Sequence, residues 1–240
     1  MSDRRPVYDR VILKISGETL GRSGGPPFDP DALSLLVSRI REGIEAGGTF
    51  GIVCGGGNII RGGRLTDTGL LDRTTADGMG MLATVINSLA IRDGLERSGI
   101  PARIFSCLPV GSLTEPYSAR AGRAALENGE VVILSGGIGN PYVSTDTAAV
   151  LRACELDAGA VFKATTVDGI YSADPKLDPT ARKFDRISYE QALADGLGIM
   201  DGPAIALARE NRIAVIVFDF REENAIRRAL AGETVGTLLG

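Results

Sequence analysis

The sequence contains no histidine, and this absence removes several kinds of catalytic chemistry. Without imidazole there is no Ser-His-Asp triad, no Cys-His pair and no histidine-ligated metal. Lysine is scarce as well, with only Lys14, Lys163, Lys176 and Lys183. Genome composition is the simplest explanation for few lysines. However, Lys14 and Lys163 fall in glycine-associated turns, where a compact positive charge suits a phosphate.

Three further absences limit where the chain works and what it binds. The three cysteines, Cys54, Cys107 and Cys154, lie far apart in apolar segments with no CxxC pair, which predicts buried thiols in a reducing cytoplasm. The N-terminal MSDRRPVYDR has no apolar core, so no secretory leader is expected, and no run reaches membrane-spanning length. The net charge of −4 argues against general binding to nucleic acid.

What is present predicts an α/β fold. The chain has 240 residues, 44% of them hydrophobic, which is enough for one domain with two lobes dividing near residue 150. Short apolar runs alternate with helical patterns, as expected for a mostly parallel sheet covered on both faces. The predicted strands are 8–15, 49–54, 101–107, 131–135, 160–164 and 214–219, and the predicted helices are 30–46, 76–98, 118–128, 145–157, 188–195, 203–212 and 222–231. Segment 20–28 is expected to be a loop, or a lid, and 172–187 a surface connection.

Glycine-rich turns follow four of the apolar runs. They are Lys14-Ile-Ser-Gly17, Gly55-Gly-Gly-Asn58 with Arg61, Gly136-Gly-Ile-Gly-Asn-Pro141 and Lys163-Ala-Thr-Thr-Val-Asp-Gly169. Glycine lets the backbone approach a ligand, and amide N–H groups at such turns suit phosphates. Neither GxxxxGK[ST] nor a helix-opening GxGxxG occurs. Four turns at equivalent strand ends predict a shared crevice for more than one phosphate group, and therefore phosphoryl transfer.

Five segments carry a family resemblance. They are LKISGE (13–18), GGGNIIRG (55–62), DGMGMLATVINSLAIRD (77–93), GNPYVSTDTAA (139–149) and KATTVDGIYSADP (163–175). Together, and colinearly from about residue 7 to 239, they resemble the bacterial-type uridylate (UMP) kinases of the amino acid kinase superfamily. The resemblance implies a three-layer αβα sandwich. It also implies that UMP is held by the N-terminal half, about 1–150, and ATP by the C-terminal half, about 151–240.

The same resemblance implies residue roles. Lys14, Arg61 and Lys163 would act catalytically on the phosphates, and Asp146 would orient the two lysines. The implied ATP contacts are Lys14, Ile15, Ser16, Gly17, Gly57, Arg61, Thr165, Tyr171 and Asp174; the implied UMP contacts are Gly56, Asp77, Ile138, Gly139, Asn140, Pro141, Tyr142, Val143, Ser144 and Thr145. Mg²⁺ is expected to arrive with ATP, and no protein-ligated metal is expected.

The chemistry supports these roles independently. The second pKa of a phosphomonoester is about 6, so the UMP phosphate is mostly ionised at pH 7. A general base is therefore unnecessary, and a chain without histidine loses nothing. The difficulty is to bring two polyanions together, which requires positioning and charge neutralisation.

Several residues have an alternative structural interpretation. Asp146 and Asp77 each lie near a predicted helix start and also suit helix capping, and Asp201 suits an N-cap or an active-site role equally. Met79 and Met81 fit a buried helix or a subunit interface better than a cofactor contact. The resemblance implies a hexamer built from dimers with this helix near the dimer interface. It also implies GTP activation and UTP inhibition, with Arg103 and the 21–28 loop in the effector regions.

Some positions depart from the family pattern. Ile138 replaces a usual threonine, Tyr142-Val143-Ser144 a common Phe-Phe-Thr, Gly78 a histidine or tyrosine, and Thr166 a lysine. The loss of one hydroxyl at Ile138 bears on selectivity between UMP and CMP. Two rival functions stay open: a superfamily kinase with a carboxylate, carbamate or small phosphate acceptor, and a nucleotide- or oxyanion-binding storage or sensor protein.

Overall fold

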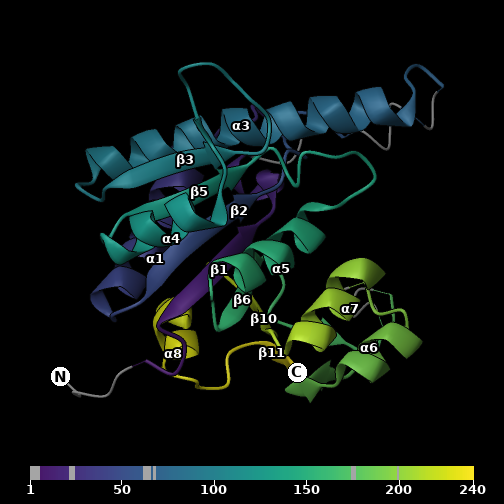
Figure 1. The fold of residues 1–240 in the computed structure, drawn as a ribbon. Coiled ribbons are helices and arrows are strands. Elements are labelled where there is room, and N and C mark those ends of the chain that lie inside the picture. Colours follow the sequence, from purple (N-terminus) through teal and green to yellow (C-terminus); the bar gives the residue numbers. More distant parts are fainter. Residues whose placement is uncertain (1–5, 22–24, 62–65, 67–68, 174–176, 199) are drawn as a thin grey trace.

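The computed structural model describes residues 6–21, 25–61, 66, 69–173, 177–198 and 200–240. Within these residues a nine-stranded sheet forms the centre of the molecule (Figure 1). Its strands, in order across the sheet, are β4 (Glu115–Pro116), β3 (Ala102–Ser106), β5 (Val131–Ser135), β2 (Thr49–Cys54), β1 (Arg10–Ile15), β6 (Ala160–Thr165), β10 (Ala214–Asp219), β11 (Thr237–Leu239) and β9 (Arg186–Ile187). Every neighbouring pair is parallel except β10 and β11. The strands β7 (Ile170–Tyr171) and β8 (Lys183–Phe184) pair separately and are antiparallel.

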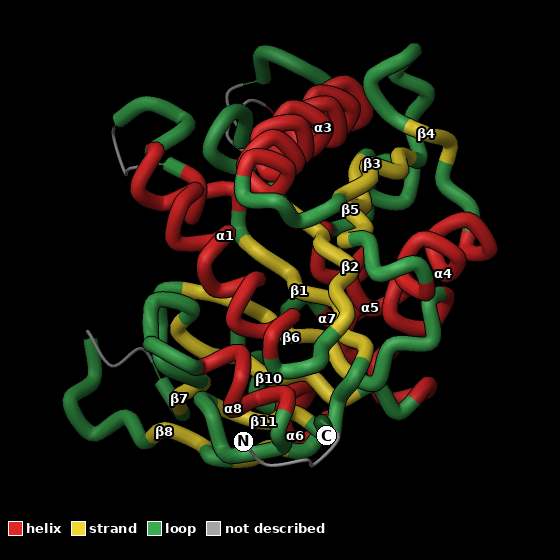
Figure 2. The backbone as a smooth tube through the Cα atoms, turned by 90° about the vertical axis from the view of Figure 1, so that its left-hand side faces the viewer, coloured by secondary structure: helices red, strands yellow, loops and turns green. Residues whose placement is uncertain are grey.

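Helices cover both faces of the sheet. On one face lie α1 (Pro30–Glu45), α3 (Arg73–Arg97) and α8 (Ala225–Leu230); on the other lie α4 (Ala119–Glu127), α5 (Thr145–Glu155), α6 (Tyr189–Ala194) and α7 (Gly202–Asn211) (Figures 1 and 2). Strand β1 illustrates the division, because Val11, Leu13 and Ile15 join the first hydrophobic core and Ile12 joins the second. The predicted three-layer αβα sandwich is confirmed.

Local sequence signals explain where the helices begin. At α1, Asp29 accepts the N–H of Asp31 at 2.9 Å and Pro30 occupies the first helical position. Serines cap α4, α5 and α6 in the same way, each accepting a backbone N–H from the first turn. Since these capping residues are visible in the sequence, the predicted helix starts agree with the structure to within a few residues.

Two predicted segments differ from the structure. The 76–98 helix begins earlier, at Arg73, because Asp72 caps it by accepting the N–H of Thr75 at 3.0 Å. The 172–187 segment is more than a surface connection, since it contains β8 and β9 and its last residue, Ile187, is 2% exposed in the second core. The short strands β4, β7 and β11 carry too few residues to leave a sequence pattern.

The order of the strands creates a seam in the middle of the sheet. The strands before residue 150 lie together on one side, those after it lie on the other, and β1 and β6 meet between them. The carboxyl ends of these parallel strands share one edge, where the glycine-rich turns follow. Ligands of open parallel sheets bind at such a point. No helix within the described ranges is long and apolar enough to cross a membrane.

A substitution at Phe162 tests the packing of the first hydrophobic core. Its side chain is fully buried between the rings of Tyr8 and Phe218, with edge-on centroid distances of 6.1 and 6.0 Å. We expect Phe162→Ala to lower the free energy of unfolding by about 3–5 kcal/mol, because it leaves a cavity in a packed core. Urea denaturation measures this loss. Leu177→Ala, at an 84% exposed position, is the control and should change stability by less than about 0.5 kcal/mol.

Candidate functional site

Three charged side chains meet at the seam of the sheet. Lys14 of β1 and Lys163 of β6 are register partners on adjacent strands, so both side chains project from the same face. Asp146, in the first turn of α5, lies between them: Lys14 Nζ is 2.7 Å from Oδ1, and Lys163 Nζ is 2.8 Å from Oδ2. All three side chains are at least 84% buried. The structure therefore brings together the two lysines and the carboxylate that the resemblance pairs.

Burial and neighbouring opposite charges shift the pKa values of these side chains in opposite directions. Burial raises the pKa of the Asp146 carboxyl, but the charges of Lys14 and Lys163 outweigh it and hold this pKa below its usual value. Burial lowers the pKa of the Lys163 ammonium, and neighbouring Lys14 lowers it further against the opposing effect of Asp146. A carboxylate with a lowered pKa is a poor proton acceptor. Asp146 is therefore suited to hold cations and not to remove a proton.

A hydrogen-bond chain fixes the helix that presents Asp146. Ser144 caps α5 by accepting the N–H groups of Asp146 and Thr147 at 3.1 and 3.0 Å. Asp201 accepts from the Ser144 hydroxyl at 2.7 Å and from the Thr147 hydroxyl at 2.9 Å. Asp201 stands at the N-cap position of α7, but its side chain makes no capping hydrogen bond there. Its carboxylate braces the start of α5 instead, beside the three charges.

A pocket opens next to these charges. It is lined by residues of the turn after β2, of α3 and of the turn after β5, namely Gly56, Gly57, Ile60, Ala76, Asp77, Gly80, Met81, Thr84, Gly137, Asn140, Val143 and Thr145. The turn after β2 packs closely on α3, because a Cβ at Gly56 would lie 2.7 Å from the Gly80 carbonyl oxygen. Met81 lines this pocket. Two of the four glycine-rich turns predicted to share a crevice, those after β2 and β5, thus line one pocket.

Asp77 holds the turn that follows β5. It lies one turn inside α3, whose cap is Asp72, so the capping interpretation of Asp77 is wrong. Its Oδ2 accepts the backbone N–H of Tyr142 and the Nε–H of Arg73, each at 2.8 Å. Tyr142 has a φ of 67°, a conformation that needs such support in a non-glycine residue. Arg73 also lies over the Tyr142 ring, 5.1 Å from its centroid.

The expected UMP contacts divide into two groups in the structure. Gly56, Asp77, Asn140, Val143 and Thr145 line the pocket. Five others, Ile138, Gly139, Pro141, Tyr142 and Ser144, belong to the same turn but are not among the lining residues. Ile138 is partly buried and packs against the second hydrophobic core instead. Tyr142, by contrast, is 67% exposed.

The turn after β1 carries the other expected phosphate contacts. Ser16 caps the short 3₁₀ helix η1 (Gly17–Leu20) by accepting the N–H of Glu18 at 3.3 Å. Glu18 forms an ion pair with Arg61, whose side chain is 47% exposed. Ile15 is fully buried in the first core, so its backbone alone can meet a ligand. Arg61 and Ser16 thus lie on either side of Glu18, beyond the ends of β1 and β2.

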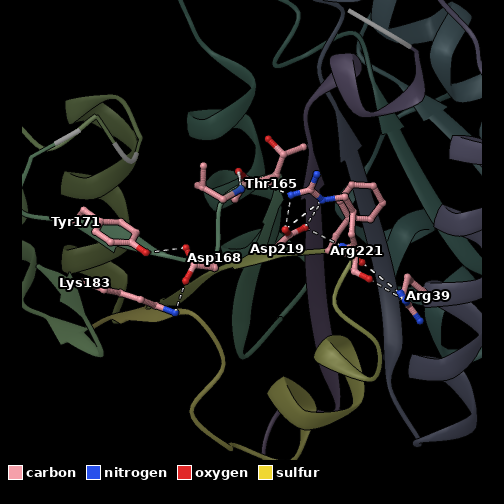
Figure 3. Close-up of polar contacts among 10 residues, drawn as sticks. Arg39, Thr165, Asp168, Tyr171, Lys183, Asp219 and Arg221 are labelled. Atoms are coloured by element: carbon pink, nitrogen blue, oxygen red, sulfur yellow. Dashed lines mark hydrogen bonds and ion pairs between the residues drawn. The ribbon is translucent and has the colours of Figure 1, made fainter. Parts of the chain in front are cut away.

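A second polar group lies beyond the ends of β6 and β10 (Figure 3). Thr165 accepts the N–H of Val167 at 3.1 Å, and its register partner on β10 is Asp219. Asp219 binds the Arg221 guanidinium, which also donates to the Thr166 carbonyl at 2.8 Å. Burial raises the pKa of Asp219, but Arg221 outweighs this effect and the pKa lies below its usual value.

Tyr171 belongs to the same region. Its hydroxyl donates to Asp168 at 2.9 Å, and Lys183 Nζ donates to the other carboxylate oxygen at 3.1 Å (Figure 3). Sequence reasoning selected Thr165 and Tyr171 but missed Asp168, Lys183, Asp219 and Arg221. Asp168 belongs to the KATTVDG motif, so the sequence could have indicated it as a site residue. Lys183 follows residues 172–182 and is part of no motif. Asp174, an expected ATP contact, lies outside the described residues.

Comparison with known proteins gives a consistent result. The model of the amino acid kinase family matches residues 9–219. The uridylate kinase of Psychrobacter sp. (strain PRwf-1) is 46% identical over 237 residues, covering 99% of this chain and 98% of that protein. The uridylate kinase of Marinobacter nauticus is 48% identical over 238 residues, with the same coverage. The crystal structure of UMP kinase from Bacillus anthracis superposes with a TM-score of 0.94 at 36% identity, covering 98% of this chain and 97% of that one.

Asp146 offers a test of the buried charges that does not depend on activity. Asp146→Asn leaves two buried ammonium groups without their carboxylate, and we expect the free energy of unfolding at pH 7 to fall by about 3–5 kcal/mol. Because the folded-state pKa is below that of the unfolded chain, about 3.9, this contribution is present above pH 4 and lost as pH falls through the lowered pKa. Urea denaturation of both proteins between pH 3 and 7 measures the difference. A difference that does not shrink on acidification would contradict this arrangement.

Proposed function

Because this chain belongs to the amino acid kinase family, we propose that it is a uridylate kinase, which transfers the γ-phosphoryl group of ATP to UMP and yields UDP and ADP. The observation that carries the proposal is the pairing of Lys14 and Lys163 across the seam of the sheet, beside a pocket that Asp77 and Gly56 line. Full-length similarity to uridylate kinases supports the choice of acceptor. The product belongs to pyrimidine nucleotide synthesis.

The mechanism relies on position and charge. An ionised UMP phosphate attacks the γ-phosphorus, the bond to the bridging oxygen of ATP breaks, and ADP leaves with that electron pair. No proton has to be removed, since the acceptor is already mostly ionised near pH 7. Lys14, Lys163 and Arg61 neutralise the negative charge that gathers on the transferred group. Asp146 holds both lysines in place while no phosphate is bound.

The two substrates approach from opposite sides of the seam. ATP takes the turns after β1, β2 and β6, with phosphates near Ser16, Gly17 and Gly57 and its nucleoside toward Thr165 and Tyr171. UMP takes the pocket between α3 and the turn after β5. Ile138 is partly buried against the second core and does not line the pocket, so the pyrimidine contacts fall to backbone groups and to Asn140. This division assigns the acceptor to about residues 1–150 and the donor mainly to 151–240, within one domain.

The pocket chemistry favours a nucleotide over a carboxylate acceptor. Among the described residues that line it, Asp77 is the one charged side chain. A carboxylate repels an acidic amino acid, whereas it accepts hydrogen bonds from ribose hydroxyls. An acetylglutamate or aspartate acceptor would need an arginine in this place. A storage or sensor role explains less, because it does not require two buried lysines at the donor phosphates.

Magnesium fits this site as an ion carried by ATP. No group of three or more Cys, Asp or Glu side chains in the described part of the chain is arranged to hold a metal. The nearby carboxylates are already engaged, Asp146 with two lysines and Asp201 with two hydroxyls. Mg²⁺ commonly binds through substrate phosphates and water. When bound, it would neutralise phosphate charge alongside the lysines.

Assembly, location and regulation complete the proposal. Helix α3 exposes Leu82 and Ile86, one turn apart and 49% and 47% exposed, which suits a dimer contact within a hexamer. We place the enzyme in the cytoplasm, where its three free cysteines stay reduced. GTP would activate and UTP inhibit. Because Arg103 is bonded to Glu115 at 2.8 Å and Glu130 at 3.4 Å, an effector phosphate would have to displace both carboxylates.

The acceptor is tested by measuring ADP release with Mg²⁺-ATP and UMP, CMP, dTMP, AMP, acetylglutamate or aspartate. We expect turnover with UMP, and a loss of about 10²–10³-fold in kcat for Lys14→Ala, because one charge-assisted contact is removed. Arg97→Ala, at a 78% exposed side chain on α3, is the control and should keep full activity. Activity on a carboxylate alone would show the right fold with a different acceptor.

Assembly is tested by light scattering on the native enzyme. We expect six times the 25.1 kDa mass of one chain, and a smaller species for Leu82→Glu/Ile86→Glu, because two charges would be buried in the contact. Leu177→Glu adds a charge at an 84% exposed position elsewhere and should leave the mass unchanged. If the α3 variant keeps the native mass, this helix is not the contact.

A further inference from the structure

The side chains of Asn58 and Asn87 form a reciprocal amide pair that the reaction described above does not use. Asn58 ends the Gly55-Gly-Gly-Asn58 turn after β2, and Asn87 lies in α3 with 0% of its surface exposed. Asn87 Nδ2 donates to Asn58 Oδ1 at 2.8 Å, and Asn58 Nδ2 donates to Asn87 Oδ1 at 3.0 Å. The pair thus joins two segments that are about thirty residues apart in sequence.

The remaining amide hydrogens of the pair bind backbone carbonyls. Asn87 Nδ2 also donates to Gly55 O at 2.7 Å, and Asn58 Nδ2 also donates to Pro27 O at 2.8 Å. All four N–H donors of the two amides are therefore used. Aspartate at position 87 would lack these donors, and an apolar side chain would leave the carbonyl of Gly55 without its partner. The chemistry of this place requires an amide.

The turn after β1 packs against the same pair. A Cβ at Gly17 would lie 2.5 Å from Asn58 Oδ1 and 2.5 Å from Gly55 O, so only glycine fits there. The amide pair therefore lies directly behind the two turns to which the donor phosphates are assigned, those after β1 and β2.

The same helix lines the acceptor pocket. Asp77, Gly80, Met81 and Thr84 of α3 all face it. Thr84 Oγ1 also accepts the backbone N–H of Gly136 at 2.8 Å, which fixes α3 to the turn after β5. One helix is therefore hydrogen-bonded to the turn after β2 through Asn87 and to the turn after β5 through Thr84.

We propose that the Asn58–Asn87 pair is a positioning device, which sets the distance between the phosphoryl donor and its acceptor by fixing α3 to the turns after β1 and β2. Neither side chain is assigned a contact with substrate, so both act through the backbone that they hold. The inference rests on the proposed function, because it assigns the donor to one side of the pair and the acceptor to the other.

The expected effect is on the chemical step more than on binding. A misplacement of about 1 Å between reacting groups costs on the order of 10²-fold in rate. Breaking the pair loosens one half of the site against the other, while each substrate keeps its own contacts. We therefore expect kcat to fall by roughly 10- to 100-fold and each KM to change by no more than about threefold.

The experiment is a double-mutant cycle on the full-length enzyme with Asn58→Ala, Asn87→Ala and both together. Ser88→Ala is the matched control: Ser88 is 1% exposed on the same helix, and its hydroxyl donates to Thr84 O at 2.8 Å within α3. Rates are measured well below the lowest melting temperature of the set. We expect each single variant to show the loss in kcat, the double variant to lose about as much as one single variant, and Ser88→Ala to stay within about twofold.

Three results would overturn the proposal: unchanged kcat in the single variants, losses that multiply in the double variant, or an equal loss in Ser88→Ala. Asn58 is partly exposed, so Asn58→Ala alone still decides the matter if Asn87→Ala does not fold. Wild-type turnover is measured first with each acceptor of the panel above. If the wild type does not use UMP, the proposed function is wrong. The kcat values of the double-mutant cycle are then measured with the acceptor that the wild type does use.

Discussion

The structure depends on two ammonium groups being held side by side in a buried place. Lys14 and Lys163 are strand neighbours, and without a carboxylate between them their repulsion would oppose the pairing of β1 with β6. Asp146 removes this conflict and needs a fixed helix to do so, which the Ser144 cap and the Asp201 carboxylate supply. The buried charges are thus stabilised in the free protein.

The same arrangement explains how one sheet serves two substrates. Because β1 and β6 form the boundary between the strands before and after residue 150, the lysines stand where both groups of turns begin. Helix α3 contributes the other fixed reference, since its side chains line the pocket and bind the turns after β2 and β5. The register of β1 and β6 therefore places the two lysine charges, and the contacts of α3 and α5 fix the surrounding turns and Asp146.

Much of this could be predicted from the sequence, because the signals are local. Apolar runs gave six of the strands, and capping residues such as Asp29 gave helix starts. Motifs located the lysines and Asp146. Long-range contacts could not be read in this way. Asp77 looked like a cap because Asp72 was not recognised as the true one, and the support that Asp201 gives to α5 crosses more than fifty residues. Lys183 and Asp168 meet only after β7 and β8 pair.

The most direct test of the central claim is an NMR titration of the lysine ε-carbons, which only four lysines make simple to assign. The account predicts that Lys163 titrates below the ordinary lysine value of about 10.4, and that Asp146→Asn lowers its pKa further because the raising effect of the carboxylate is lost. Titration of Lys163 at the ordinary value in both proteins would contradict a buried site in which Asp146 holds the two lysines.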